Sequence, residues 1–455
     1  MDPSDFLRER PGLRFIDLLL HDMNGVDRGK RIDAAAAPST FREGLLLPAS
    51  MFAIDVQGHT IQSTGLGFDD GDGDRLCLPL PGTLFDVPWL DHGVAQVQLT
   101  MHEADGRPFF GDPRHQLAAL LAHFRSAGLT PVIAVELEFY LVDRERTADG
   151  RPQPPRGLLT GRREHRTQIN SMTDLDEFSA VLADIDAACL AQGVPSTSSL
   201  AEYGPGQYEV NLAHGPDALR ACDQAVRFRR IVKAIARRHG LDATFLAKPY
   251  RDMAGSGLHL HVSVLDADGR NIFADDRPGG PEALRQAVGG MLATMADGMA
   301  LFAPNANSWR RLQPSAYVPL QANWSTNNRG TALRIPVSDA ANRRIEHRVA
   351  GAEANVYLVT AWVLAGLWRG LTRRLEPPPP LQGNAYGAAA AGPAGGEPLP
   401  RHWALAIERF ATSTQAAEVF GSRFRDLFAT LKRGELADFD SHVTPLECDW
   451  YLGPL

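Results

Sequence analysis

The pattern of apolar and polar residues divides the chain into two parts. Near its start, two apolar runs within residues 15–32 flank a turn at Asn24 and Gly25, which is a strong signal for a β-hairpin. Further strand-like segments follow up to about residue 108. We therefore expect a small, mostly β N-terminal domain over residues 1–108 and a larger domain over residues 109–455.

Helical periodicity appears in the second part of the chain, between short strand-like segments. Apolar residues recur three and four positions apart in segments 115–129, 175–193, 217–240 and 281–303 and in the stretch after Glu353. A passage rich in Pro, Gly and Ala, residues 376–400, is expected to be irregular. The larger domain is therefore expected to combine helices with strands.

Two carboxylates stand one residue apart in the otherwise apolar segment 131–142. Alternation along a strand would place Glu136 and Glu138 on one face, with Val135 and Leu137 on the other. Two anions in such a place repel each other and lose hydration, so a cation should meet them. A divalent metal ion satisfies this requirement, and a half-exposed edge strand with a charged face is the ordinary alternative.

Another candidate strand carries His259, His261 and Ser263 on one face and only Leu and Val on the other. Imidazole is a common ligand of divalent metals, and a second imidazole two residues on can meet phosphate oxygen. Glu202 and Glu209 flank a Gly-Pro-Gly turn and add two more carboxylates near apolar sequence. These residues strengthen the metal hypothesis, although a turn with solvated acids is the ordinary interpretation of the last two.

Charged residues of both signs cluster farther along the chain. Glu346 and Arg348 fall on one face of a predicted strand, where a plain cross-strand ion pair is the alternative to a site. The segment before this strand holds the arginines Arg310, Arg311, Arg329 and Arg334. Guanidinium groups hold carboxylate and phosphate through paired hydrogen bonds. The segment therefore predicts an anion-binding wall, with scattered surface arginines as the alternative.

Composition excludes several classes of protein. An apolar fraction of 44% and a charged fraction of 22% are ordinary for a globular protein. The formal charge of −8 argues against nucleic acid or an anionic membrane as the partner. Four scattered cysteines and the lack of a signal-peptide pattern favour a cytoplasmic protein. Neither a P-loop nor a dinucleotide-binding glycine motif is present.

Six segments, in order, resemble the glutamine synthetase superfamily over nearly the whole chain: ELEFYL, AEYGPGQYEVNL, AKPYRDMAGSGLHLHVS, NSWRRLQPSAYVP, NNRGTALRIP and RRIEHRVAGAEANVYL. The segments DLLLHDMNGVDRGKRI, LLLPASMFAIDVQGHTIQSTGLG and TPLECDWYL resemble its γ-glutamylputrescine and γ-glutamylpolyamine synthetase branch. The resemblance implies an α+β fold, with a β-grasp-like N-terminal domain and a catalytic domain built on a curved antiparallel sheet with helices. It also implies a homo-oligomer, usually a dodecamer of two hexameric rings, with active sites between neighbouring subunits.

The same resemblance implies a role for each candidate residue. One metal ion, Mg²⁺ or Mn²⁺, would be held by Glu138, Glu202 and Glu209, and a second by Glu136, His259 and Glu346. The nucleotide would contact His261 and Ser263, and its phosphates Arg334. Glutamate would be bound by Gly255, Arg311 and Arg348, with Arg329 between glutamate and the transferred phosphate.

A reaction follows from these implied roles. Divalent cations would clamp ATP while the γ-carboxylate of L-glutamate attacks its γ-phosphoryl group, which gives γ-glutamyl phosphate. An amine would then attack the carbonyl carbon of this mixed anhydride, and ADP, phosphate and a γ-glutamyl amide would leave. Because an anhydride exposed to water hydrolyses, the site must close around it.

Tyr317 distinguishes the chain from the ammonia-using members of the family. In those enzymes the segment that matches PSAYVP carries a glutamate that helps to bind and deprotonate ammonium, and a neutral aromatic side chain cannot supply that charge. The difference predicts an amine with its own carbon body, with putrescine or another polyamine ahead of ethanolamine or an alkylamine. Asp55 is the nearest match to the aspartate that orients the amine from the adjacent subunit.

Three classes of function are compatible with these motifs. An ATP-dependent ligase that joins glutamate to an organic amine is favoured. A glutamine synthetase that uses ammonia is second, because Tyr317 argues against it. A structural or regulatory member without activity is third, because such a protein should have lost metal ligands, and all six candidate ligands are present.

Overall fold

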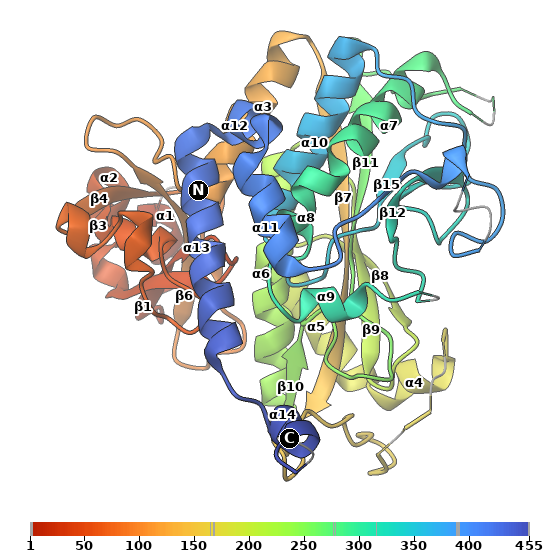
Figure 1. The fold of residues 1–455 in the computed structure, drawn as a ribbon. Coiled ribbons are helices and arrows are strands. Elements are labelled where there is room, and N and C mark those ends of the chain that lie inside the picture. Colours follow the sequence, from red (N-terminus) through yellow and green to blue (C-terminus); the bar gives the residue numbers. More distant parts are fainter. Residues whose placement is uncertain are drawn as a thin grey trace.

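The computed structural model describes residues 3–163, 165–166, 169–275, 277, 279–314, 316–387 and 392–453. Two large sheets dominate this part of the chain. Figure 1 shows the N-terminal sheet on the left and the larger sheet with its helices on the right. The N-terminal strands therefore belong to one sheet, and the strands that carry the candidate active-site residues belong to the other.

A six-stranded sheet occupies the N-terminal part. Its elements are α1 (Pro3–Arg8), β1 (Phe15–His21), β2 (Asp27–Asp33), α2 (Ala37–Glu43), β3 (Leu45–Pro48), β4 (Asp74–Pro79), β5 (Phe85–Asp86) and β6 (Val94–His102). The strand order is β2-β1-β6-β4-β3, and β5 pairs with β6. β1 and β2 are antiparallel neighbours, and Gly25 between them has a φ of +70°, which a glycine adopts without strain. The predicted hairpin is confirmed.

An eight-stranded, curved sheet forms the centre of the larger part. Its strands are β7 (Thr130–Asp143), β8 (Ser196–Ala201), β9 (Gln207–Leu212), β10 (Leu241–Thr244), β11 (Leu258–Leu265), β13 (Trp324–Thr326), β14 (Leu333–Ile335) and β15 (Ile345–His347). The order is β13-β14-β15-β11-β7-β9-β8, with β10 paired to β7. Only the β13–β14 pair is parallel among the pairings of these described strands. The expectation of mixed α and β content around a curved sheet is confirmed.

Helices cover this sheet. They are α3 (Pro113–Ser126), α4 (Met172–Glu177), α5 (Ser179–Ala191), α6 (Ala218–Arg238), α7 (Glu282–Met295), α8 (Met299–Phe302), α9 (Ser308–Arg311), α10 (Val356–Arg373), α11 (Trp403–Thr412), α12 (Thr414–Phe420), α13 (Ser422–Ser441) and α14 (Pro445–Tyr451). Two predicted helices, 175–193 and 281–303, are each divided into shorter ones. The described part of 376–400 is irregular as predicted, except for a short 3-10 turn at Pro393–Gly395 and β16 (Glu397–Pro398), which pairs with β12 (Gln321–Ala322).

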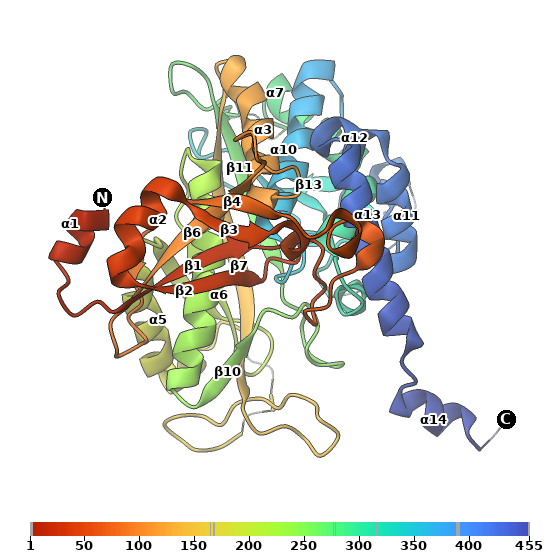
Figure 2. The same cartoon turned by 90° about the vertical axis from the view of Figure 1, so that its left-hand side faces the viewer.

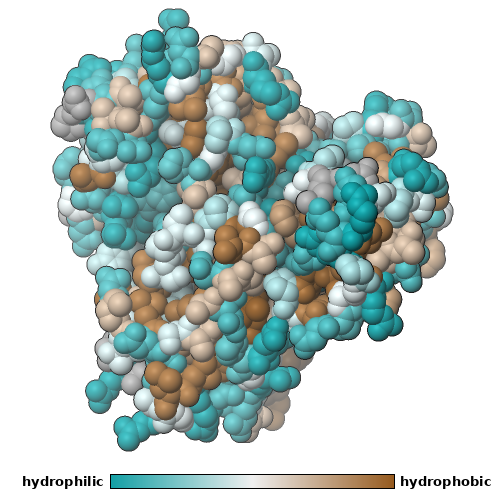
Figure 3. Space-filling view, turned by 180° about the vertical axis from the view of Figure 1, so that it is seen from behind, coloured by the Kyte–Doolittle hydropathy of each residue, from teal (hydrophilic) through white to brown (hydrophobic). Residues whose placement is uncertain are grey.

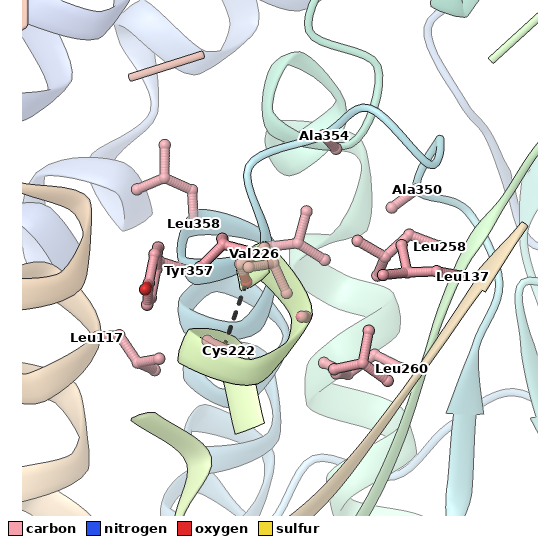
Figure 4. Packing of buried hydrophobic residues seen from close by; sticks show 14 of the residues in the cluster. Leu117, Leu137, Cys222, Val226, Leu258, Leu260, Ala350, Ala354, Tyr357 and Leu358 are labelled. Carbon is pink, nitrogen blue, oxygen red and sulfur yellow. Dashed lines mark hydrogen bonds between the residues drawn. The ribbon is translucent and has the colours of Figure 1, made fainter. Parts of the chain in front are cut away.

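One face of the large sheet packs on helices, which leaves the opposite face for polar residues. Leu137 of β7 and Leu258 and Leu260 of β11 point toward α6 and α10, where Val226 and Leu358 lie (Figure 4). Burying each such side chain contributes roughly 1.5–3 kcal/mol. Because side chains alternate along a strand, this packing determines that the residues between the leucines face the other way.

The C-terminal helices end in an arm. Figure 2 shows α14 standing apart from the rest of the molecule beyond α13. The face seen in Figure 3 is largely hydrophilic, with hydrophobic residues gathered in separate patches. Among the described residues, no helix combines the length and the apolar character needed to cross a membrane.

Candidate active site

A large cleft opens on the polar face of the eight-stranded sheet. Its volume is about 1220 Å³, which exceeds the usual 300–1,000 Å³ of a small-molecule site. Strands β7, β8, β9 and β11 supply its floor, and the segments around Tyr317, Arg329 and Arg344 supply its walls. The cleft therefore has room for more than one small substrate.

Strand register brings the candidate metal ligands into one row across the sheet. Glu138 of β7 lies opposite Glu209 of β9, and Glu136 lies opposite His259 of β11. On the other side of β11, His261 lies opposite Glu346 of β15, which in turn lies opposite Arg334 of β14. Directly opposed residues in antiparallel strands have Cβ atoms about 4.5–5.5 Å apart. The pairing alone therefore gathers ligands that are distant in sequence.

Two groups of three side chains have the geometry for metal ions. The ligand atoms of Glu136, His259 and Glu346 lie within 4.8 Å of one another, and so do those of Glu138, Glu209 and His259. The first group is the set that the sequence implied for the second metal. Oxygen and imidazole nitrogen are the ligands that Mg²⁺ and Mn²⁺ accept in proteins, so the donor set fits a divalent cation.

Three carboxylates of the cleft are electrostatically unfavourable as anions. Burial, with repulsion from Glu202, raises the pKa of Glu138 to about 8, and burial beside Glu136 and Glu138 raises the pKa of Glu209 to about 10. Burial also raises the pKa of Glu202. A divalent cation bound here would displace protons and make the charged forms favourable. The donor set of these three carboxylates therefore fits a bound divalent cation.

The other two carboxylates of the row, Glu136 and Glu346, are ionised. Burial opposes ionisation of Glu346, but Arg348, His259 and His261 outweigh it and bring its pKa to about 2. Arg334 Nη1 donates to Glu346 Oε2 over 2.7 Å, and Arg348 donates to its other oxygen. Burial likewise opposes ionisation of Glu136, yet hydrogen bonds from His259 and His261 hold its pKa well below the ordinary value. Glu346 is thus compensated by two arginines, and Glu136 is stabilised by hydrogen bonds from two imidazoles.

The predicted arginine wall is confirmed in part: Arg311, Arg329 and Arg334 line the cleft, whereas Arg310 is exposed and is not among its lining residues. Arg311 donates through Nη1 to the carbonyl oxygen of Val349 over 2.9 Å, and its Nε has no hydrogen-bond partner among the described residues. The same holds for Nε of Arg334 and Arg348. Gly255 lies against Arg311, where a Cβ would come within 2.8 Å of its Cγ. These free donors suit an anionic substrate.

Sequence reasoning missed two polar neighbours of the row. Arg344 Nε donates to His261 Nδ1 over 3.2 Å, so the proton of His261 lies on Nε2, which faces Glu136 Oε2 at 3.2 Å. Asn211 Nδ2 donates to Glu209 Oε1 over 3.0 Å. The signal was available for Asn211, which stands two residues from Glu209 on β9 and shares its strand face, whereas Arg344 precedes β15.

Two tyrosines stand side by side at the cleft. The rings of Tyr203 and Tyr317 are stacked, with centroids 6.3 Å apart and planes 26° apart. Tyr317 is half exposed and has a φ of +52°, in the left-handed region that bulky residues rarely adopt. Such strain costs about 1–3 kcal/mol and concentrates at functional sites. Tyr203 was not predicted, and no signal in the sequence pairs it with Tyr317.

The remaining predicted residues occupy two different places. Ser263, Arg329 and Glu202 line the cleft, although Glu202 is outside the two groups of metal-competent atoms. Asp55 is not among the residues that line the cleft of its own chain. Its Oδ1 accepts hydrogen bonds from the backbone N–H groups of Gln57 and His59, both over 2.8 Å. A role for Asp55 in a neighbouring subunit stays a prediction.

Comparisons with known proteins show what the chain is similar to. The family model described as glutamine synthetase, catalytic domain, matches residues 110–451. The gamma-glutamylputrescine synthetase PuuA of Escherichia coli (strain K12) is 40% identical over 447 residues, covering 98% of this chain and 93% of that protein. A glutamate–isopropylamine ligase of Pseudomonas sp is 30% identical over 455 residues, covering 98% and 96%. The solved structure described as GmaS/ADP complex, conformation 1, has a TM-score of 0.85 at 28% identity, covering 99% of both chains.

Proposed function

The chain belongs to the glutamine synthetase family of ligases, and we propose that it joins the γ-carboxylate of L-glutamate to an organic amine while ATP is converted to ADP and phosphate. The observation that supports this reaction most directly is the row of carboxylates, histidines and arginines in one cleft. The favoured amine is putrescine or another polyamine, because the relative that is 40% identical is named a gamma-glutamylputrescine synthetase.

Each part of the cleft has a chemical task in this proposal. Arg311 and Arg348, with the backbone of Gly255, hold glutamate, and Arg329 stands beside its γ-carboxylate. The nucleotide lies along His261, Ser263 and Arg334. Divalent cations, Mg²⁺ or Mn²⁺, held by Glu136, Glu138, Glu202, Glu209, His259 and Glu346, would offset the charge of the triphosphate.

The reaction then needs two displacements. A γ-carboxylate oxygen of glutamate attacks the γ-phosphorus of ATP, the bond to ADP breaks, and γ-glutamyl phosphate forms. The amine, as its free base, attacks the carbonyl carbon, and phosphate leaves. The arginines hold both anionic reactants close together, and a closed cleft keeps water from the mixed anhydride.

The tyrosine pair supports an amine with a carbon body. The faces of Tyr203 and Tyr317 offer apolar contact for methylene groups and a negative ring surface for a distal ammonium group. Neither ring carries the charge that would hold ammonium by itself. An amine with a chain therefore gains contacts in this cleft that ammonia cannot make.

An assay of phosphate release tests the function. The purified protein would receive ATP, L-glutamate, Mg²⁺ or Mn²⁺ and one nucleophile at a time: ammonia, isopropylamine, ethanolamine, putrescine or spermidine. We expect kcat/KM for putrescine or spermidine to exceed that for ammonia by at least about tenfold, which corresponds to about 1.4 kcal/mol of added contact. Turnover with ammonia alone would show that the protein is a glutamine synthetase. A lack of turnover with every nucleophile would favour the structural alternative.

Replacing Tyr317 by alanine tests the amine site separately. We expect KM for the amine to rise about tenfold, because one aromatic contact to the substrate is lost, while KM for glutamate stays unchanged. Tyr317→Phe is the matched control, since it keeps the ring and should behave nearly as the wild type. Equal effects of both variants, or a rise in the KM for glutamate, would contradict the assignment.

We further propose a homo-oligomer, a dodecamer of two hexameric rings, in the cytoplasm. In it the β-grasp-like N-terminal domain, residues 1–108, would bring Asp55 to the catalytic domain, residues 109–455, of the neighbouring subunit. The C-terminal arm supports assembly, because it exposes the hydrophobic side chains of Val443, Leu446, Trp450 and Leu452.

A further inference from the structure

A second cleft lies between the N-terminal sheet and helix α6. Its volume is about 550 Å³, and it is separate from the candidate active site. Figure 2 shows α6 running past β2, the edge strand of that sheet. The lining residues come from β2, from the loop before β6 and from α6: Asp27, Trp89, Leu90, Arg230, Lys233, Ala234, Arg237 and Arg238. From these residues we propose that the cleft binds a compact multivalent anion, a polyphosphate or a polycarboxylate.

The charge of this cleft is opposite to that of the whole chain. Four cations and one carboxylate line it, whereas the chain carries a formal charge of −8. Arg230, Lys233 and Arg237 follow one another at intervals of three and four residues along α6, so they share one helix face. Like charges in this spacing destabilise a helix. An anion in the cleft would remove that repulsion.

The four cations differ in what already engages them. Arg230 is fully used, because it donates to Gln96 Oε1 over 2.9 Å and to Asp17 Oδ2 over 3.0 Å. Its Nη1 also lies 3.7 Å from Asp27, the carboxylate of the cleft. Asp17 therefore neutralises Arg230, which forms part of the wall, and Asp27 is the one carboxylate of the cleft that faces the three remaining cations.

Lys233 is the most available of these three. Within the part of the chain that the structure describes, no carboxylate oxygen lies within 4.0 Å of its ammonium group and no hydrogen bond holds it, and the ammonium nitrogen lies 6.0 Å from the centre of the Phe245 ring. Arg237 and Arg238 are exposed and have only distant carboxylate partners, with Asp242 at 3.7 Å and Asp91 at 4.0 Å, and Arg238 Nη1 also donates to the carbonyl oxygen of Pro88 over 3.1 Å. Exposed pairs of this kind contribute between about 0 and 1 kcal/mol, so a ligand can displace them readily.

The helix itself explains only part of this cluster. Arg237 and Arg238 stand in the last turn of α6, where the helix dipole favours cations. Lys233 stands five residues before the end of the helix at Arg238, and the dipole effect falls off within one turn. The dipole therefore does not account for Lys233, whose pKa is lowered by burial and by repulsion from Arg229 and Arg237, against attraction from Asp27.

The wall next to these cations is apolar. Trp89 is 9% exposed, and Leu90 and Ala234 lie beside it in the cleft. A wall of low polarity strengthens the attraction between a bound anion and its cations. The cleft is too small for a macromolecule but holds a molecule with two or three phosphate or carboxylate groups. A monovalent anion would leave most of the positive charge uncompensated.

Calorimetric titration of the full-length protein tests the proposal. Pyrophosphate and citrate would be the two probes, in EDTA and at constant ionic strength, so that metal-dependent binding in the other cleft is suppressed. We expect one site per chain for at least one probe, with an affinity that falls as salt rises. Binding of pyrophosphate alone would identify a polyphosphate site, and binding of citrate alone a polycarboxylate site.

Variants locate the binding. Lys233→Ala should lower the affinity at least about tenfold, as expected for the loss of a charge-assisted hydrogen bond, and Lys233→Ala with Arg237→Ala should lower it further. Arg125→Ala removes an exposed arginine of α3 and should leave the affinity unchanged. Turnover without the probe should be normal in all three. Equal affinity in the wild type and Lys233→Ala, or no binding of either probe, would overturn the proposal.

Discussion

Glu138→Ala is expected to lower turnover about 10³-fold, because the electrostatic stabilisation supplied by a bound metal ion is worth several kcal/mol and each 1.4 kcal/mol is a factor of ten. Glu138 is a member of one of the two metal-competent groups, and its Oε2 also accepts a hydrogen bond from the backbone N–H of Gly257 over 2.8 Å. Its pKa of about 8 shows that the carboxylate is unfavourable there without a cation. The measurement is phosphate release at saturating ATP, glutamate and amine.

Two controls separate this effect from misfolding. Glu145→Ala removes an exposed carboxylate just beyond β7 and should leave turnover normal. Without metal, Glu138→Ala should unfold at nearly the wild-type temperature, because the buried carboxylate that it removes is itself unfavourable. Near-normal turnover in Glu138→Ala, or a large loss of stability in the metal-free variant, would show that the residue is not a metal ligand.

Gly290→Ala is expected to lower the free energy of unfolding by about 2 kcal/mol or more. A Cβ at this position of α7 would lie 2.2 Å from the carbonyl oxygen of Gly366 and 2.3 Å from the nitrogen of Gly370, both on α10. Alanine favours the helix by about 1 kcal/mol, but overpacking against backbone that cannot rotate away costs about 3 kcal/mol or more. Packing therefore decides the sign of the change in the free energy of unfolding, because it outweighs helix propensity.

Thermal unfolding of the metal-free protein measures this effect. Gly290→Val adds two more methyl carbons to the same contact and should prevent recovery of soluble protein. Gly12→Ala is the matched control, because a Cβ at Gly12 meets nothing within 4 Å, and its stability should be unchanged or slightly higher. An unfolding temperature for Gly290→Ala at or above the wild-type value would mean that α7 and α10 are not in close contact.

Much of the local structure could be predicted because short-range patterns determine it. The alternation in β7 and β11 correctly places the glutamates and histidines on one face of the sheet and the leucines on the other. The hairpin at Gly25 follows from its turn residues. Where helical periodicity continued across the boundary between two helices, the prediction was less accurate. The segment 175–193 reads as one helix, yet α4 ends at Glu177 and α5 begins at Ser179.

Long-range contacts could not be read from the chain. The stacking of Tyr203 on Tyr317 joins segments more than a hundred residues apart, and the basic cleft joins α6 to a loop of the other sheet. The close approach of α7 and α10 at Gly290 depends on which helix faces which, and a glycine in a helical pattern carries no such information. Asp55 could be named but not placed in a site, because its implied site lies in another subunit.

By itself, the sequence determined the composition of the candidate site: which carboxylates, histidines and arginines share a strand face, because alternation depends only on neighbouring residues. Only the tertiary structure decided which of these faces meet. The pairing of β9, β7, β11, β15 and β14 joins Glu209, Glu138, Glu136, His259 and Glu346 into one row, and that order of strands is set by packing over the whole sheet. Local sequence patterns thus identify the candidate ligands, whereas their assembly into one site depends on contacts between residues far apart in sequence.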